Sequence, residues 1–479
     1  MKAIELNHVS FAYDGYETKI LTDACMSVEY GEVALLSGCS GEGKSTVLSL
    51  IAGIIPNITP GEITGEVLIG GESIAGRKLS EVCRKVGVVL QNAEAQIIQQ
   101  LVEDEIAFGC ENFAFSPDLI RESICRACDQ MKLAPEWNTR TLSGGQKQRL
   151  ITAATLATQQ KILVLDEPLA NLDKAGAALL MTALGKLAKT GYAVLVVEHR
   201  LDMVLPYVDT VWSIRGGRIE RVESKQEYLA AQAKFIRDDT PPVSLSEPVF
   251  QVAHAAFSAG GREILADVSF DVKKSERLLL LGENGCGKTT LLRLIARLNT
   301  PARGRITQSI DPALGQGTKG SRAWFKRVGV VYQNPNYQLF MPTVQQEISF
   351  GAQSETYAKE IMELFDIAHL AQRHPQSLSE GQKRRVSIAA VAASNPSVLL
   401  LDEPTVGQDY VGLSGMVRVL NQLHTQSGNT MITITHDMRC AEALCDHAVL
   451  IENGVTAKEG GKELVHSYFY GAQASPSVS

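Results

Sequence analysis

The sequence has no long hydrophobic run and no excess of positive charge. No stretch of about 18 consecutive apolar residues occurs in the 479-residue chain, so no segment is expected to cross a bilayer as a helix. The N-terminus lacks an apolar run followed by a small-residue cleavage site, so no secretory signal is expected. Lys and Arg number 46 against 53 Asp and Glu, a net charge of −7. This acidic balance argues against a protein whose main task is to grip nucleic-acid phosphates.

Cysteine is also scarce. Nine cysteines, an odd number, are dispersed along the chain, which is typical of reduced thiols in a cytosolic compartment. Apolar residues make up 45% and charged residues 21%, which excludes a mostly disordered or fibrous chain. At about 150 residues per domain, the length predicts roughly three domains or two large ones.

The chain carries four motifs twice, in the same order and at a nearly constant offset. The first copies are GCSGEGKST (38–46), LSGGQKQR (142–149), ILVLDEP (162–168) and VVEH (196–199). The second copies are GENGCGKTT (282–290), LSEGQKRR (378–385), VLLLDEP (398–404) and TITH (433–436). Such a repeat predicts two copies of one domain. Prolines between them predict a linker at 239–245, with domains at 1–238 and 246–479 and a frayed tail at 471–479.

Short apolar runs predict the core of each domain. KILVLD and SVLLLD end in carboxylates, and AVLVVEH and TMITITH end in histidine. Runs of this length without alternation are typical of parallel strands buried on both faces. Helices are predicted at 45–52 and 146–157, and a helical insert at about 90–140 and again at about 332–378. The fold class is therefore α/β, with functional residues at the carboxyl edges of the strands.

Each copy contains a phosphate-binding loop between a strand and a helix. Glycines let successive backbone N–H groups point at phosphate oxygens, and the helix N-terminus adds positive potential. Lys44 and Lys288 are expected to reach the β- and γ-phosphates, and the hydroxyls of Ser45 and Thr289 to ligate Mg²⁺. The loop residues assigned to nucleotide binding are Gly38, Ser40, Gly41, Gly43, Lys44, Ser45 and Thr46, and Gly282, Asn284, Gly285, Gly287, Lys288, Thr289 and Thr290.

An Asp–Glu pair ends one buried strand in each copy. Asp166 and Asp402 are expected to bind Mg²⁺, while Glu167 and Glu403 can accept a proton from an attacking water. An acidic strand end alone is commonly just solvated. Its place about 120 residues after a phosphate loop, in both copies, favours the functional interpretation.

A serine precedes a helix in each copy of the third motif. A lone Ser at this place is an ordinary N-cap, whereas a Ser hydroxyl and free N–H groups beside a phosphate loop suit a second phosphate clamp. The presence of phosphate loops in both halves favours the clamp. The residues concerned are Ser143, Gly144, Gly145 and Gln146, and Ser379, Gly381 and Gln382.

Together, these motifs resemble those of ATP-binding cassette (ABC) ATPases over nearly the whole chain, twice. The resemblance implies two P-loop NTPase domains, each with a mainly parallel sheet, a helical subdomain and an N-terminal antiparallel β part. It implies that the cassettes pair head to tail within the chain, as a pseudo-dimer, with each ATP and Mg²⁺ between one phosphate loop and the other copy's serine motif. Carried onto this sequence, the roles are Q-loop and metal for Gln91 and Gln333, switch histidine for His199 and His436, D-loop for Asp173 and Asp409, and adenine stacking for Tyr13.

The segments after Gln91 and Gln333 share the pattern QN-x4-Q followed by [TL]V-x-x-E-I-x-FG. This pattern is similar to that of the ATPases of energy-coupling factor (ECF) importers of vitamins and metal ions. It implies a separate ECF transmembrane coupling component, whose helix enters a groove here, a separate membrane substrate-binding component and a place on the cytoplasmic face of the membrane. The alternatives are a sugar-importer ATPase and a tandem cassette acting on ribosomes or nucleic acid.

Two departures from the family pattern fall in different places. Glu380 replaces the first glycine of the second serine motif, where it either repels a γ-phosphate or points to water; we favour the second orientation. Ala259 stands where the first copy has Tyr13. We therefore expect both sites to hydrolyse ATP, and the site built on Lys288 and Ser143 to bind nucleotide more weakly than the site built on Lys44 and Ser379.

Overall fold

The structure is a computed structural model that describes residues 1–15, 18–39, 41–170, 172–233, 247–406 and 408–470. The chain divides into two compact units, Met1–Ala233 and Lys234–Ser479. The predicted linker at 239–245 and tail at 471–479 lie outside the described residues, so these boundaries stay predictions. No helix in the described ranges is long and apolar enough to cross a membrane. No disulfide joins any of the nine cysteines.

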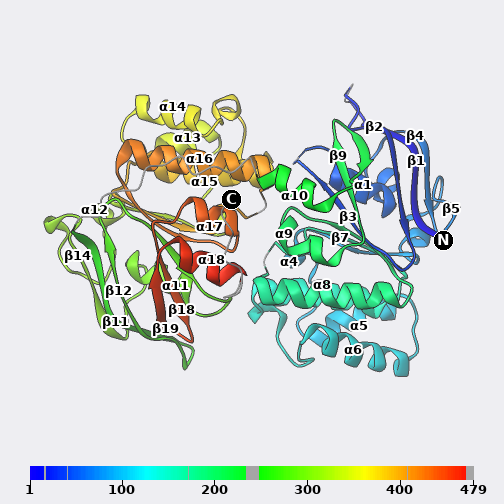
Figure 1. The fold of residues 1–479 in the computed structure, drawn as a ribbon, viewed down its shortest axis with the longest axis horizontal. Helices are drawn as coiled ribbons and strands as arrows, with labels where there is room; N and C mark the ends of the chain where they lie inside the picture. Colours follow the sequence, from blue (N-terminus) through cyan, green and yellow to red (C-terminus); the bar gives the residue numbers. More distant parts are fainter. Residues whose placement is uncertain (16–17, 40, 171, 234–246, 407, 471–479) are drawn as a thin grey trace. The chain divides into compact units, whose positions relative to one another are not determined.

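The first unit contains two sheets. An antiparallel sheet has the order β2-β1-β4-β5, and a mainly parallel sheet has the order β10-β9-β3-β8-β7-β6, in which only β9 and β10 pair antiparallel. The strands are β1 Lys2–Tyr13, β2 Leu21–Glu29, β3 Val33–Gly38, β4 Gly61–Ile69, β5 Glu72–Ser73, β6 Val86–Val89, β7 Ile162–Asp166, β8 Ala193–Val197, β9 Thr210–Arg215 and β10 Arg218–Arg221. In Figure 1 the antiparallel strands and the helices α5 and α6 lie at opposite ends of this unit.

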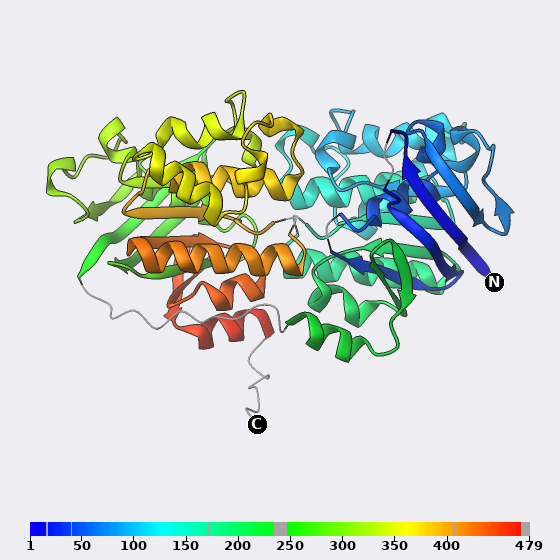
Figure 2. The ribbon, with the colours of Figure 1, turned by 90° about the horizontal axis from the view of Figure 1, so that it is seen from above.

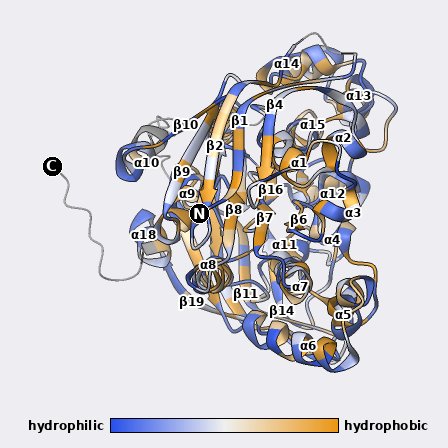
Figure 3. Cartoon of the chain, turned by 90° about the vertical axis from the view of Figure 1, so that its right-hand side faces the viewer, coloured by the Kyte–Doolittle hydropathy of each residue, from blue (hydrophilic) through white to orange (hydrophobic). Residues whose placement is uncertain are grey.

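Helices cover the parallel sheet of the first unit. They are α1 Lys44–Ile51, α2 Ile54–Asn57, α3 Leu79–Val82, α4 Ala93–Gln96, α5 Val102–Asn112, α6 Pro117–Met131, α7 Gly144–Ala157, α8 Lys174–Lys189, α9 Leu201–Val204 and α10 Lys225–Ala233, with 3-10 turns η1 Thr139–Thr141 and η2 Leu205–Tyr207. Every residue of β7 and β8 is buried, and the hydrophobic colour runs along both strands in Figure 3. Apart from Asp166 at the end of β7, these strands are apolar because helices exclude water from both of their faces.

The second unit repeats this plan in one nine-stranded sheet of order β14-β11-β12-β19-β18-β13-β17-β16-β15. Its strands are β11 Pro248–Ala259, β12 Arg262–Lys273, β13 Arg277–Leu281, β14 Arg303–Gln308, β15 Val328–Val331, β16 Val398–Asp402, β17 Thr430–Ile434, β18 His447–Glu452 and β19 Val455–Gly460. A single residue pair, Asp267 with Val455, joins its antiparallel part to the rest.

The helices of the second unit lie on both faces of its strands, as Figure 2 shows. They are α11 Lys288–Ile295, α12 Arg322–Phe325, α13 Val344–Gly351, α14 Glu355–Leu364, α15 Glu380–Ala392, α16 Tyr410–Ser427, α17 Met438–Ala443 and α18 Lys462–Tyr470. Four 3-10 turns complete the unit: η3 Pro312–Leu314, η4 Pro335–Tyr337, η5 Ala368–Leu370 and η6 Pro375–Ser377.

The predicted fold class is confirmed. The four apolar runs form the parallel strands β7, β8, β16 and β17, and the predicted helices at 45–52 and 146–157 are α1 and α7. The stretches without strand pattern hold α4, α5 and α6 in one unit and α13 and α14 in the other. Both phosphate loops therefore begin at the carboxyl end of a central strand. The next strand ends before the histidine, and the strand after that ends in the Asp of the Asp–Glu pair.

Candidate nucleotide-binding sites

The phosphate loops have the same geometry in both units. Lys44 Nζ donates to the carbonyls of Gly38 (2.9 Å) and Cys39 (2.8 Å), and Lys288 Nζ donates to those of Gly282 (2.7 Å) and Glu283 (2.8 Å). Each lysine thus lies across its own loop, at the first residue of a helix. This arrangement places a cation and a helix N-terminus together, as an anion site requires.

The glycine before each lysine is required by the backbone. Gly43 and Gly287 have φ angles of 101° and 102°, in the left-handed region that side chains disfavour. A Cβ on Gly43 would also come within 2.8 Å of Ile20 Cγ2, and one on Gly287 within 2.4 Å of Leu265 Cδ2. The chain can therefore turn from loop into helix only with glycine at these two positions.

A hydroxyl and a carboxylate meet beside each loop. Ser45 Oγ donates to Asp166 Oδ2 at 3.2 Å, and Thr289 Oγ1 donates to Asp402 Oδ2 at 3.0 Å. Burial, together with the charge of Glu167, raises the pKa of Asp166 to about 6, and burial likewise raises the pKa of Asp402. Burial disfavours the ionised form of each carboxylate, and a bound Mg²⁺ would offset this cost. The carboxylate and the neighbouring hydroxyl are oxygen ligands of the kind that Mg²⁺ prefers.

The glutamate after each aspartate sits on a strained backbone. Glu167 and Glu403 have φ angles of 47° and 53°, which are unusual for a residue with a side chain. Their amides are held by strand-end carbonyls, that of Glu167 by Val197 and that of Glu403 by Ile434, each at 2.9 Å. The turn directs both carboxylates to the edge where the phosphate loop begins.

In the first unit, two predicted side chains converge on Glu167. Gln91 Nε2 donates to Glu167 Oε2 at 2.9 Å, and His199 Nε2 lies 3.1 Å from Glu167 Oε1. Gln91, Glu167 and His199, which are far apart in the sequence, thus form one hydrogen-bonded cluster. Such a cluster is able to hold a water and accept its proton.

The second unit brings the same residues together differently. His436 Nε2 lies 3.5 Å from Glu403 Oε1, and the His436 backbone N–H donates to Glu403 Oε2 at 3.2 Å. Gln333 contacts helix α15 through its main-chain carbonyl, which accepts a hydrogen bond from Arg384 Nη2. The Gln–Glu–His clusters of the two units are therefore similar in composition but differ in the hydrogen bonds of their Gln and Glu side chains.

The serine motifs form matching helix starts. Ser143 caps α7 and Ser379 caps α15, each in a reciprocal capping box with the glutamine three residues on, Gln146 or Gln382. Glu380 is about half exposed and pairs with Lys383 at 3.2 Å. Its carboxylate thus has water and a cation beside it, as the favoured orientation requires.

The remaining predicted residues that the structure describes lie at a strand end, at helix starts and in the phosphate loops. The Tyr13 hydroxyl lies 3.0 Å from Thr46 Oγ1, and its ring meets Phe11 edge-on at 4.8 Å, whereas Ala259 ends the equivalent strand β11. Asp173 and Asp409 cap α8 and α16. The phosphate loops and helix starts contain Gly41, Asn284, Gly285, Thr290, Gly144, Gly145 and Gly381, and Ser40 lies outside the described residues.

Several buried polar residues of the site region were not assigned a role from sequence. Glu105 Oε2 accepts the N–H groups of Ile98 (2.8 Å) and Gln99 (2.7 Å), and Glu347 Oε2 accepts those of Phe340 (2.9 Å) and Met341 (2.7 Å). Both glutamates belong to the repeated V-x-x-E-I pattern, so their recurrence was the available signal. They fix the segment that follows each Q-loop.

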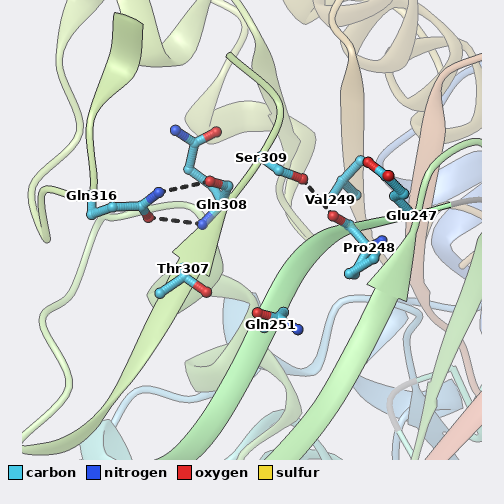
Figure 4. Close-up of a pocket in the computed structure, with 8 residues that line it drawn as sticks. All are labelled: Glu247, Pro248, Val249, Gln251, Thr307, Gln308, Ser309 and Gln316. Atoms are coloured by element: carbon cyan, nitrogen blue, oxygen red, sulfur yellow. Dashed lines mark hydrogen bonds between the residues drawn. The ribbon is translucent and has the colours of Figure 1, made fainter. Parts of the chain in front are cut away.

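A separate hollow of about 560 Å³ in the second unit is lined by residues of β11 and β14 and the segments beside them (Figure 4), none of which belongs to the phosphate loop. Gln308 and Gln316 on its wall bond to each other, with the Gln308 N–H donating at 2.9 Å and Gln316 Nε2 donating at 2.8 Å. Ser309 Oγ is likewise bonded to the Pro248 carbonyl. Because its polar groups stabilise the wall itself, this hollow is no candidate for the nucleotide.

Two phosphate loops, each with an Asp–Glu strand end and a histidine in an α/β unit, define a tandem P-loop ATPase. The family model described as ABC transporter matches residues 21–170 and 265–406. The chain belongs to the ABC transporter family, whose members bind and hydrolyse ATP.

Relatives match over nearly the full length. The chain is 30% identical to a Bacillus subtilis protein provisionally named HMP/thiamine import ATP-binding protein YkoD, over 95% of this chain and 91% of that protein. It is 31% identical to a provisionally named ABC transporter ATP-binding protein of Streptococcus mutans, over 94% of this chain and 89% of the relative. Among solved structures it is similar to an RNase-L inhibitor, with a TM-score of 0.70, 21% identity and coverage of 96% and 92%. At that identity, the structural likeness shows the fold alone.

Proposed function

We propose that this ATPase energises a membrane importer of the ECF type that carries a vitamin or a transition-metal ion. The observation that carries the proposal is a set of exposed apolar side chains beside each Q-loop. Tyr337, Phe340 and Phe350 of the second unit are 77%, 68% and 71% exposed. Such a group of aromatic side chains in water is typical of a protein-binding surface.

The segment after each Q-loop presents these side chains on a fixed backbone. The buried carboxylate of Glu347 binds the N–H of Phe340, whose ring meets that of Phe350 edge-on at 6.1 Å. In the first unit Glu105 binds the N–H of Ile98, which is 67% exposed. The occupant that fits is a short apolar helix of a transmembrane coupling component. Both surfaces follow a proposed Q-loop residue, Gln91 or Gln333, and so adjoin the proposed site of ATP hydrolysis.

The proposed chemistry follows from the site residues. Lys44 and Lys288 neutralise β- and γ-phosphate charge, and Glu167 and Glu403 take a proton from the attacking water. His199 and His436 orient that glutamate and hydrogen-bond the γ-phosphate. Ser45, Gln91 and Asp166, and Thr289, Gln333 and Asp402, would hold Mg²⁺, which neutralises developing phosphate charge when bound. Each ATP is proposed to lie between one unit's lysine and the other unit's serine, Ser379 or Ser143.

Energy transfer is proposed to work through closure of the two units around ATP and their release after hydrolysis. The partners are then separate membrane proteins, a coupling component and a substrate-binding component, and the chain is peripheral on the cytoplasmic face. The name of the Bacillus subtilis relative, which refers to thiamine import, supports a vitamin as the class of cargo.

Co-purification tests the proposal. The tagged chain, extracted in mild detergent from its native cells, is expected to carry small hydrophobic membrane proteins. Ile98→Glu combined with Phe340→Glu should remove them, because a buried carboxylate is costly in an apolar interface. Ile58→Glu is the matched control, since Ile58 is 65% exposed against 67% for Ile98. Recovery of ribosomes in place of membrane proteins would refute the importer and support the ribosome-associated alternative. Recovery of sugar-importer subunits would refute the ECF assignment alone.

A further inference from the structure

The residue before the first switch histidine is a buried glutamate with two backbone partners. Glu198 is 2% exposed and follows the last residue of β8. Its Oε2 accepts the N–H of His199 at 2.7 Å, and its Oε1 accepts the N–H of Leu169 at 3.1 Å. The Glu198 carboxylate thus joins the backbone at His199 to the backbone at Leu169, two residues after Glu167.

The residue after the histidine binds the same segment from its carbonyl side. Arg200 Nη1 donates to the carbonyls of Leu169 (3.0 Å) and Leu172 (2.7 Å). Glu198 and Arg200 therefore hold Leu169 by both its N–H and its carbonyl. The backbone that follows Glu167 is therefore fixed relative to His199.

The second unit has neither residue. Thr435 stands in place of Glu198, and its hydroxyl accepts the N–H of Asp437 at 3.1 Å. The N–H of His436 is bound instead by the proposed base itself, through Glu403 Oε2 at 3.2 Å. In the first unit the equivalent N–H is already bonded to Glu198, and Glu167 is bonded to the side chains of Gln91 and His199.

We propose that Glu198 is a positioning residue for ATP hydrolysis: by taking the His199 N–H, it keeps the Glu167 carboxylate directed at the side chains of Gln91 and His199. A backbone N–H donates one good hydrogen bond, so two carboxylates that could accept it compete. This inference rests on the proposed role of Glu167 as the base.

The test measures the effect of Glu198→Thr, which introduces the residue of the second unit, in two backgrounds. Each background retains only one of the two proposed catalytic glutamates. With Glu403→Gln present, only Glu167 remains as a base, and with Glu167→Gln present, only Glu403 remains. Single-turnover hydrolysis of pre-bound ATP and ATP affinity are measured in both. We expect Glu198→Thr to slow hydrolysis about tenfold in the first background and less than twofold in the second, with ATP affinity within twofold.

The two backgrounds separate positioning from a merely structural role. If Glu198 only supports the fold, Glu198→Thr should lower hydrolysis equally in both or weaken ATP binding, and either result overturns the proposal. If Glu198→Thr does not fold, Glu198→Gln carries the same comparison, because its amide nitrogen cannot accept the second N–H. If the Glu403→Gln protein hydrolyses nothing before Glu198 is changed, the assigned role of Glu167 fails, and the Glu198 proposal falls with it.

Discussion

At the scale of single residues, the site depends on a glutamate that each unit holds in an unfavourable backbone conformation. Glu167 and Glu403 both adopt left-handed φ angles, which cost on the order of 1–2 kcal/mol for a residue with a Cβ. Hydrogen bonds to the ends of β8 and β17 maintain the conformation. The same strained turn in both units, directed at the phosphate loop, is what a base for the attacking water requires.

Replacing both bases should separate hydrolysis from binding. Glu167→Gln with Glu403→Gln keeps the size of each side chain but removes the proton acceptor, so steady-state turnover should fall at least about 100-fold. ATP affinity, measured by equilibrium binding, should stay within about threefold. Turnover close to that of the unaltered chain would show that the bases are assigned wrongly.

Asp166 should make the nucleotide-free protein less stable at neutral pH. Burial and the charge of Glu167 raise its pKa from 3.8 to about 6, so between these values the folded state binds more protons than the unfolded state. Stability from this group is therefore present at low pH and is lost as pH rises towards 6, by up to about 3 kcal/mol.

Asp166→Asn removes the buried charge and leaves an oxygen to accept from Ser45. In EDTA without nucleotide, this variant should unfold at a higher denaturant concentration than the unaltered chain at pH 7.5, with a smaller difference at pH 5. Asp402→Asn should act in the same direction, because burial also raises the pKa of Asp402. An Asp166→Asn protein less stable than the parent at pH 7.5 would contradict the argument.

At the scale of elements, the two serine-capped helices differ at a buried position that faces the Q-loop in the second unit. Arg384 of α15 donates to the carbonyls of Tyr332 (3.0 Å) and Gln333, and burial lowers its pKa to about 10. Gln148 occupies the same place in α7, fully buried, and within the described residues neither atom of its amide has a partner. At this position a charged side chain thus links the helix to the Gln333 segment in the second unit, whereas in the first unit the neighbouring Lys147 makes the charged link, to Glu94 at 2.6 Å.

Leucine at these two positions should have opposite effects. Gln148→Leu removes an unsatisfied buried amide and should stabilise the protein by about 1 kcal/mol. Arg384→Leu leaves two carbonyls without a donor and should destabilise it by about 2–4 kcal/mol. Denaturant unfolding of both variants measures the difference, and a stabilising Arg384→Leu would count against the proposed link.

At the scale of the whole molecule, the chain is two similar units whose sites are unequal. Tyr13 has an aromatic ring beside the first phosphate loop, whereas Ala259 ends the equivalent strand of the second unit. If each ATP is shared between units as proposed, Lys44→Ala leaves the site on Lys288, and Lys288→Ala leaves the site on Lys44. The Lys288→Ala protein should bind ATP several-fold more tightly, as measured by calorimetric titration, because aromatic stacking is lost at the other site. Equal or reversed affinities would contradict this ranking.

The sequence by itself determined the repeat, the α/β class and the motifs of both sites. It did so because the phosphate loop, the apolar strand and the serine cap each obtain their geometry from residues next to one another. The predicted strands and helices formed at the expected positions, and the convergence of Gln91, Glu167 and His199 follows from parallel strands ending at one edge.

Only the tertiary structure decided which donor each buried carboxylate binds. Glu105, Glu198 and Glu403 are all buried glutamates, yet each binds a different backbone N–H. Glu105 binds that of Ile98 and Glu198 that of His199, whereas Glu403 binds that of His436, whose ring lies 3.5 Å from its other oxygen. A buried carboxylate must be satisfied, and the N–H groups within reach are set by segments that approach from distant parts of the chain. Two nearly identical motif sets therefore become two differently bonded sites.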